Sequence, residues 1–252
     1  AEASTAPTEA PTAAPTATEP PAEQATTAPI STDTEYHDDQ IDIVLTTMRV
    51  ENTTVYVADV QIADISLLKT ALAGNTYARN LTETTSVQAA NAGAILAING
   101  DYYNYKDKNG LVIRNGVLYR DAASSRDQLL VMRDGTFIAL PRGTYAAGEG
   151  QKYIDEGVVQ SFTFGPLLVN DGEAVELPEK YIISTKDTIR EPRTAIGQVD
   201  ANHYVLVVAD GRRDGWSDKG MTLQELQQVF VEQGCNCLLY TSPSPRDISG
   251  SR

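Results

Sequence analysis

The segment "RTAIGQVDANHYVLVVADGR" (residues 193–212) contains two apolar runs around a polar turn near residues 200–202. The runs are rich in β-formers, and the second one ends in Asp210-Gly211-Arg212. Apolar runs bounded by turn residues predict two neighbouring buried strands. Because a strand fixes the backbone of the residues that follow it, polar side chains at its end are candidates for chemistry. This stretch therefore predicts the centre of a sheet and one edge of a site.

The next segment, "MTLQELQQVFVEQG" (residues 221–234), predicts a helix. Thr222 and Glu225 have the spacing of a capping box, and Gly234 is a suitable C-terminal stop. Apolar residues at helical spacing predict one buried face. That face consists of Leu223, Leu226, Val229 and Phe230.

A further strand is expected after this helix, but the chain continues with "CLLYTSPSPRD" (residues 237–247). Its two prolines remove backbone donors and disfavour both a helix and a central strand. One back-translation of the stretch matches a transposon-type adapter from sequencing libraries. We therefore expect residues 237–252 to be adapter-derived and exclude them from the fold. Residues 34–236 then form a single, C-terminally truncated domain.

The N-terminal residues 1–33 are mostly Ala, Thr, Pro and Glu, which predicts a disordered, extended linker. Such a linker favours an exported protein, secreted or tethered to a cell wall or membrane. The formal charge is −14, from 34 acidic and 20 basic residues, so a nucleic-acid partner is not expected. No stretch has the length of a transmembrane segment.

The remaining elements predict an α+β fold in which mixed β-sheets are flanked by helices. A strand is expected at residues 53–62, and helices are expected at 65–75 and 85–92. The short apolar run "AILAI" (94–98) is suited to a buried strand. Hairpin turns are expected at three dipeptides, and these are Asn115-Gly116, Asp134-Gly135 and Asp171-Gly172.

Polar residues gather at three places after apolar runs. In "AINGDYYN", Asn99 and Asp101 can bind a ligand while Tyr102 and Tyr103 offer stacking faces; a plain Asn-Gly turn is the alternative. Arg193 can hold a phosphate by paired hydrogen bonds, or it can be a structural arginine. The third place is the loop before the helix expected at residues 221–234, and this loop is either an anion site or a charged surface loop. Its polar residues are Asp210, Arg212, Arg213, Asp214, Trp216 and Asp218.

Other catalytic classes lack the required residues. The two histidines, His37 and His203, have no clear partners in the sequence, and no Cys/His spacing indicates a metal site. Nucleotide-binding glycine motifs are absent too. The sequence therefore predicts no metal and no cofactor, and chemistry that relies on carboxylates and arginines.

Five motifs follow one another along the chain, and these are "ILAINGDYYN", "GLVIRNGVLYR", "FGPLLVNDGE", "EPRTAIGQVD" and "VLVVADGRRDGWSDKGMTLQELQQVFVEQGCN". Their order and intervals resemble the phosphodiester glycosidase family, which includes the uncovering enzyme acting on N-acetylglucosamine-1-phosphodiesters. The resemblance implies hydrolysis of a sugar-1-phosphodiester within an exported glycan-processing protein. It also implies a strand and an Asn-Leu-Asp-Gly-Gly-Gly-Ser-Ser loop after "GCN", which this chain lacks. We therefore expect a weakened fold and no useful activity.

On this resemblance, the substrate is a phosphorylated glycan or sugar phosphodiester, and Arg193 and Arg212 hold its phosphate. Asp210 is the retained acidic catalytic candidate, while the nucleophile is left open between it and an aspartate of the missing loop. Asp101 and Asn99 contact sugar hydroxyls, and Tyr102 stacks on the ring. Two other classes stay open: a non-catalytic carbohydrate-binding module, and a phosphodiesterase that cuts the P–O bond.

Overall fold

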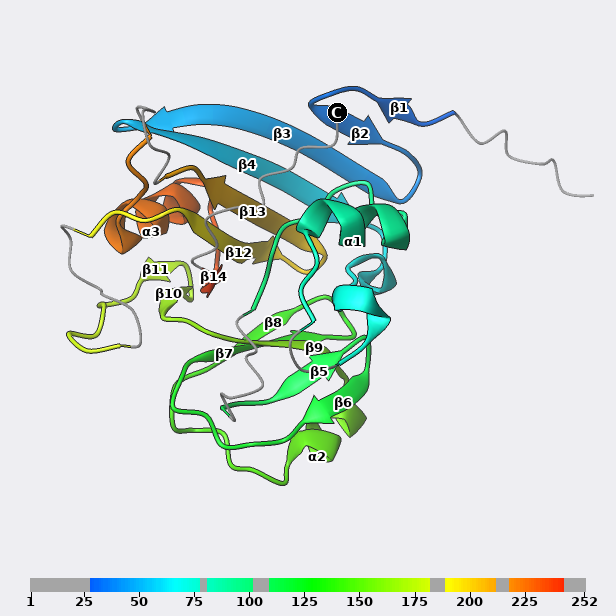
Figure 1. Ribbon diagram of the computed structural model, residues 1–252, viewed down its shortest axis with the longest axis vertical. Helices are drawn as coiled ribbons and strands as arrows, with labels where there is room; N and C mark the ends of the chain where they lie inside the picture. The colour runs from blue at the N-terminus through cyan, green and yellow to red at the C-terminus, as the bar shows by residue number, and fades with distance from the viewer. Residues whose placement is uncertain (1–27, 78–80, 102–108, 182–188, 212–217, 243–252) are drawn as a thin grey trace, which may run out of the picture.

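The computed structural model describes residues 28–77, 81–101, 109–181, 189–211 and 218–242 (Figure 1). Within these ranges the fold is built mainly of strands, with one large sheet and two small ones. The strands of the large sheet are β1 Ile30–Ser31, β2 Glu35–His37, β3 Ile41–Val50, β4 Thr53–Ile62, β10 Leu167–Asn170, β11 Glu173–Ala174, β12 Arg193–Asp200, β13 His203–Ala209 and β14 Cys237–Ser242.

These strands lie in the order β1-β2-β3-β4-β13-β12-β14-β10-β11. Every pair among the described strands is antiparallel, in contrast to the mixed sheets that we expected. The reason is that tight turns join neighbours such as β3–β4 and β12–β13, and such turns return the chain antiparallel. The α+β class remains compatible with this β-rich architecture.

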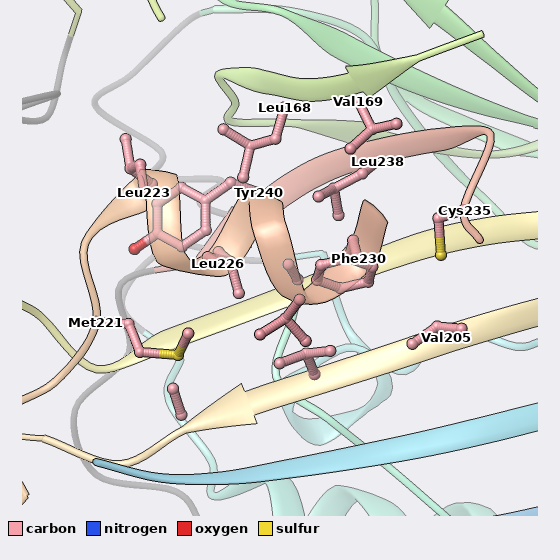
Figure 2. Close-up of a cluster of buried hydrophobic side chains, with 14 of the residues drawn as sticks. Leu168, Val169, Val205, Met221, Leu223, Leu226, Phe230, Cys235, Leu238 and Tyr240 are labelled. Carbon is pink, nitrogen blue, oxygen red and sulfur yellow. The ribbon is translucent and has the colours of Figure 1, made fainter. Parts of the chain in front are cut away.

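One face of the large sheet is covered by helix α3 (Leu223–Glu232). The predicted capping box is confirmed, because the Thr222 hydroxyl accepts from the Glu225 amide and the Glu225 carboxylate accepts from the Thr222 amide. The predicted apolar face is also confirmed, since its four residues are buried. Figure 2 shows Leu223, Leu226 and Phe230 packed with residues of the sheet. Burying each of these large side chains stabilises the fold by about 1.5–3 kcal/mol.

The two small sheets and a short helix, α2 (Gly150–Asp155), form a second layer below the large sheet (Figure 1). Phe137 stacks on Tyr204 of β13 with 5.0 Å between ring centroids, and its amide donates to Gln198 of β12. Leu129 and Phe162 belong to the same buried cluster. The strands of this layer are β5 Val112–Arg114, β6 Val117–Arg120, β7 Gln128–Met132, β8 Phe137–Leu140 and β9 Val158–Thr163.

Strand β14 is the main departure from the sequence analysis. Residues 237–242 were excluded from the fold, yet they form an interior strand of the large sheet, between β12 and β10. Leu238, Leu239 and Tyr240 are fully buried. The prolines that disfavour a strand begin only at Pro243, so this apolar run is free to pair. The expectation of an empty strand position is wrong, while the adapter origin of these codons stays a prediction.

The expected helix at residues 65–75 is replaced by two single turns, η1 (Ile65–Leu67) and η2 (Ala73–Asn75). Between them Thr70 binds the second layer, because its amide donates to Asn115 and its hydroxyl donates to Gln160. These contacts with distant residues hold the segment extended and override its helical spacing. By contrast, the predicted helix α1 (Thr85–Ala92) is confirmed.

The run at residues 94–98 is not a strand, and Ile95 is exposed. Leu96 packs against the outer part of the large sheet, near β3 and β4. A five-residue apolar run is compatible with several structures, and no neighbouring strand pairs with this one. Asn99 therefore follows an irregular segment. The strand expected at residues 53–62 is confirmed as β4, and the expected turns all join paired strands.

At the N-terminal end, β1 lies inside the segment assigned to the linker, while residues 1–27 fall outside the described ranges. No helix among the described residues is both long and apolar enough to cross a membrane.

Candidate functional site

The candidate site lies at the ends of β12 and β13, where the turn Asn99-Gly100-Asp101 meets the large sheet. Thr194, the second residue of β12, donates its hydroxyl hydrogen bond to Asn99 Oδ1 at 2.9 Å. Arg193 pairs with Ala209 across the two strands, so Asp210 follows at the same end of the sheet. The structure thus brings together the motifs that contain Asn99, Arg193 and Asp210.

The turn itself is fastened to the second layer by a buried ion pair. Asp101 has a left-handed backbone (φ 62°), and its side chain is 1% exposed. Its carboxylate accepts from the guanidinium of Arg114 and, at 3.3 Å, from the amide of Thr163. Arg114 also donates to the carbonyls of Ile113 and Ser161. This geometry favours a positioning role for Asp101; its expected contact with sugar hydroxyls stays a prediction.

Asn99 presents an unpartnered donor at this turn. Its Oδ1 accepts from Thr194, but its Nδ2 is buried and has no hydrogen-bond partner among the described residues. An amide of this kind carries two N–H donors. A buried donor without an acceptor costs about 1–3 kcal/mol, which marks this atom as a candidate for ligand binding.

Arg193 is 1% exposed and is held on all three nitrogens. Nε donates to the carbonyl of Met221 at 3.0 Å, Nη1 to the hydroxyl of Tyr240 at 3.0 Å, and Nη2 to the carbonyl of Ile189 at 3.4 Å. The guanidinium also lies 5.0 Å from the centroid of the Tyr240 ring. No carboxylate among the described residues pairs with it, and two of its five N–H donors remain. The site therefore holds a buried positive charge that has no counter-ion among the residues the structure describes.

Arg193 and Thr194 point to opposite faces of the sheet. Arg193 contacts Met221 and Tyr240, which belong to the cluster under α3, whereas Thr194 contacts Asn99 on the other side. Asp210 is 4% exposed, and its amide donates to Thr54 of β4. Since side chains alternate along a strand, Asp210 belongs to the Thr194 face. The end of the sheet therefore carries Arg193 on one face and Thr194 and Asp210 on the other.

Gly211 allows the backbone that follows Asp210 to pass close to the backbone of Gly220 and Pro192. A Cβ at this position would lie 2.8 Å from the Cα of Gly220 and 3.0 Å from the nitrogen of Pro192. Only glycine fits such a backbone-to-backbone approach. The residue therefore fixes the segment after Asp210 against the start of β12.

Asp218 has a structural role. It belongs to the loop before α3, where the sequence suggested an anion site. Its carboxylate accepts from the amide and hydroxyl of Thr54, at 2.6 and 3.0 Å, and from Arg49 at 2.8 Å. Burial acts to raise the pKa of Asp218, but these hydrogen bonds and the Arg49 charge lower the pKa below its ordinary value. Asp218 thus anchors the loop to the β3–β4 hairpin.

Several predicted site residues lie outside the described ranges, so their roles stay predictions. They are Tyr102, Tyr103, Arg212, Arg213, Asp214 and Trp216.

The histidines do have partners, contrary to the sequence analysis. His203 Nε2 lies 3.0 Å from Asp59 on the neighbouring strand, and His37 Nδ1 lies 2.8 Å from Asp42. Cross-strand pairing creates both contacts, which sequence spacing does not show. Across the described parts of the chain, no three His, Cys, Asp or Glu side chains gather as metal ligands.

Sequence reasoning missed Arg114 and Thr194. Arg114 stands before the Asn115-Gly116 turn, where an arginine looks like a surface residue, yet it is only 5% exposed. Thr194 directly follows the arginine of interest and was treated as part of the strand. Its position in a motif shared with Arg193 is the one signal that pointed to it.

Comparisons with known proteins agree on one family. The family model described as phosphodiester glycosidase matches residues 92–239, more than half of the chain. A SPbeta prophage-derived uncharacterized protein of Bacillus subtilis (strain 168), YomE, is 28% identical over 160 residues, which are 61% of this chain and 23% of that protein. The chain thus spans about a quarter of this curated relative.

Solved structures show the same fold at low sequence identity. The catalytic domain of zebrafish N-acetylglucosamine-1-phosphodiester alpha-N-acetylglucosaminidase, auto-inhibited by its pro-peptide, superposes with a TM-score of 0.59 at 17% identity, covering 84% of this chain and 78% of that one. A hypothetical protein from Synechocystis gives a TM-score of 0.52 at 15% identity, covering 81% and 56%. Together with the family model, the ordered motifs and the shared fold show that the chain belongs to the phosphodiester glycosidase family.

Proposed function

We propose that the site hydrolyses the glycosidic bond of a sugar-1-phosphodiester. The observation that carries this proposal is the buried guanidinium of Arg193, which no described carboxylate neutralises, at the strand end that also holds Asp210. A buried cation of this kind is stabilised by an anionic ligand. A phosphodiester supplies that charge, and family membership supplies the sugar on its other side.

The reaction breaks the bond between the anomeric carbon and the phosphate oxygen. Water adds its oxygen to the anomeric carbon, so the products are a free sugar and a phosphomonoester. A carboxylate near the anomeric carbon stabilises the oxocarbenium-like transition state, and Asp210 is the retained candidate for this role. Because phosphate leaves as a stable anion, holding its charge with Arg193 matters more than protonating the leaving oxygen.

The setting that we propose is outside the cell. The Thr/Pro/Ala-rich N-terminal segment suits a secreted or surface-tethered protein, and the substrate class suits glycans of a wall or capsule. We propose that turnover is low, because the described part of the site offers one candidate catalytic carboxylate, Asp210, where glycosidases usually employ two. Assays therefore need the protein in excess of substrate and long incubations.

Product analysis tests the proposal. The chain is incubated with an N-acetylglucosamine-1-phosphodiester, and the products are identified by NMR. Free N-acetylglucosamine together with a phosphomonoester is the expected result. Release of N-acetylglucosamine 1-phosphate would contradict it and indicate a phosphodiesterase.

A carbohydrate-binding module is the second candidate, and one observation favours it. Glycosidases usually employ two carboxylates, but Asp101 is bound by Arg114, which leaves Asp210 as the one candidate for catalysis at the described part of the site. Binding of the diester in calorimetry, with no product after long incubation, would support this reading over hydrolysis.

A further inference from the structure

Thr194 fixes the orientation of the Asn99 side chain. The two residues are 95 positions apart in the chain, and the Thr194 hydroxyl donates to Asn99 Oδ1 at 2.9 Å. Thr194 is 1% exposed, so its side chain has little freedom to turn away. Because the amide carries its oxygen and its nitrogen on opposite sides, a donor at Oδ1 determines where Nδ2 points.

The Nδ2 group that results is buried and has no acceptor among the described residues. Asn99 as a whole is half-buried, and its neighbour Gly100 is exposed, so the amide lies just beneath the surface. Native structures rarely retain an unsatisfied donor of this kind without a functional reason. An acceptor on a bound ligand would satisfy it.

The backbone that follows Asn99 is also held in place, through the side chain of Asp101. Asp101, two residues on, is held by Arg114 and by the amide of Thr163 on β9. The Arg114 guanidinium lies 5.3 Å from the centroid of the Phe162 ring. The Asn99 amide is therefore pre-oriented from both directions, which lowers the entropy cost of binding a ligand.

We propose that Thr194 is a positioning residue, which orients the Asn99 amide so that Nδ2 donates a hydrogen bond to an oxygen of the bound sugar. The inference rests on the proposed function, because it takes the ligand to be a sugar phosphodiester. The sugar is preferred over the phosphate as the acceptor because the Arg193 charge lies on the opposite face, under α3. Thr194 acts through Asn99 and does not touch the ligand.

Dissociation constants of the N-acetylglucosamine-1-phosphodiester, measured by calorimetry, test this role. Thr194→Val removes the hydroxyl at nearly constant volume, and we expect about 3- to 10-fold weaker binding from the loss of one oriented hydrogen bond. Thr194→Ser keeps the hydroxyl and should bind within about twofold of the unaltered chain. Equal affinity of the Val variant and the unaltered chain would overturn the proposal.

A double-mutant cycle separates positioning from a general structural role. If Thr194 acts only through Asn99, then Thr194→Val should change binding by less than about twofold when Asn99 is already alanine. A full additional loss in that background would contradict the proposal, as would failure of the Ser variant to restore binding.

These outcomes are distinguishable from failure of the proposed function. If the unaltered chain binds the diester but releases no free sugar, hydrolysis fails while the affinity series still decides the role of Thr194. No binding by the unaltered chain at millimolar diester would contradict both.

Discussion

At the scale of single residues, Arg193 combines two roles that are usually separate. Its guanidinium donates to the carbonyls of Met221 and Ile189 and to the hydroxyl of Tyr240. It also places a positive charge, which no described carboxylate neutralises, at the start of β12. The planar, five-donor group can do both, whereas a lysine ammonium has three donors and no planar fork.

Substitution of Arg193 should therefore weaken binding of the diester selectively. We expect about 10-fold weaker binding for Arg193→Lys and about 100-fold for Arg193→Gln, since hydrogen bonds from a charged group contribute about 1.5–3 kcal/mol. Binding of neutral N-acetylglucosamine should change little in either variant, and this serves as the control for folding. Calorimetry with both ligands checks the prediction, and a Gln variant that binds the diester as the unaltered chain does would contradict it.

Because of Asp218, the free energy of unfolding should fall at acidic pH. Its folded-state pKa lies below the ordinary value of about 3.9, because hydrogen bonds from Thr54 and the charge of Arg49 outweigh the effect of burial. The stability that it contributes is thus fully present above about pH 4 and is lost as the pH falls through the folded-state pKa.

Urea unfolding of Asp218→Asn at pH 7, 5, 4 and 3 measures this effect. At pH 7 the variant should be about 1–3 kcal/mol less stable, because an ionised acceptor of three hydrogen bonds is lost. Below pH 4, the difference in the free energy of unfolding between the variant and the unaltered chain should become smaller. Asp33→Asn, at an exposed position, is the matched control. A difference that stays constant from pH 7 to pH 3 would rule out this role for Asp218.

At the scale of elements, β14 connects the two parts of the large sheet. It pairs with β12 on one side and β10 on the other, and it carries Cys237 toward the second layer. Burial raises the pKa of both the Cys235 and the Cys237 thiols to about 12. Since the thiolate is the reactive form, neither cysteine should react while the sheet is intact.

Thiol labelling therefore tests the placement of β14. In Cys235→Ala the remaining thiol belongs to Cys237, and a chromogenic disulfide at pH 8 should label it only as fast as the protein unfolds. Cys237→Ala, which leaves the thiol of Cys235 after α3, is the matched control. If Cys237 reacts within seconds in native buffer while Cys235 stays protected, residues 237–242 are not a central strand.

Local signals predicted most of the elements in this fold. The capping box of α3, the strand at residues 53–62 and the Asn115-Gly116 hairpin each depend on neighbours in the chain, and all three are confirmed. The helix expected at residues 65–75 was lost to contacts of Thr70 with residues far along the chain. β14 was missed because residues 237–252 were excluded from the fold. The prolines after it and the presumed adapter origin of the tail were given more weight than its apolar run.

The site was predictable only in part, because contacts between distant segments of the chain define it as well. Asn99, Arg193 and Asp210 follow from motif order, and the fold does bring their motifs to one end of the sheet. The partners that define their roles come from other segments: Thr194 for Asn99, and Arg114 for Asp101. No spacing rule connects such residues before the sheets are assembled.

At the scale of the whole molecule, the large sheet separates two chemical environments. The face under α3 holds the Arg193 charge, and the face toward the second layer holds Thr194 and the Asn99 amide. A sugar phosphodiester lying across the strand ends would place its phosphate toward the first and its sugar toward the second. The bond between them would then lie near Asp210, which follows the last residue of β13.

The central claim is that the C–O bond at the anomeric carbon is the one that breaks. Hydrolysis of an N-acetylglucosamine-1-phosphodiester in ¹⁸O-labelled water tests it most directly, because the label marks the atom that water attacks. The account predicts ¹⁸O on the anomeric hydroxyl of the free sugar and none in the phosphomonoester. Label in the phosphate would show attack at phosphorus and contradict the account.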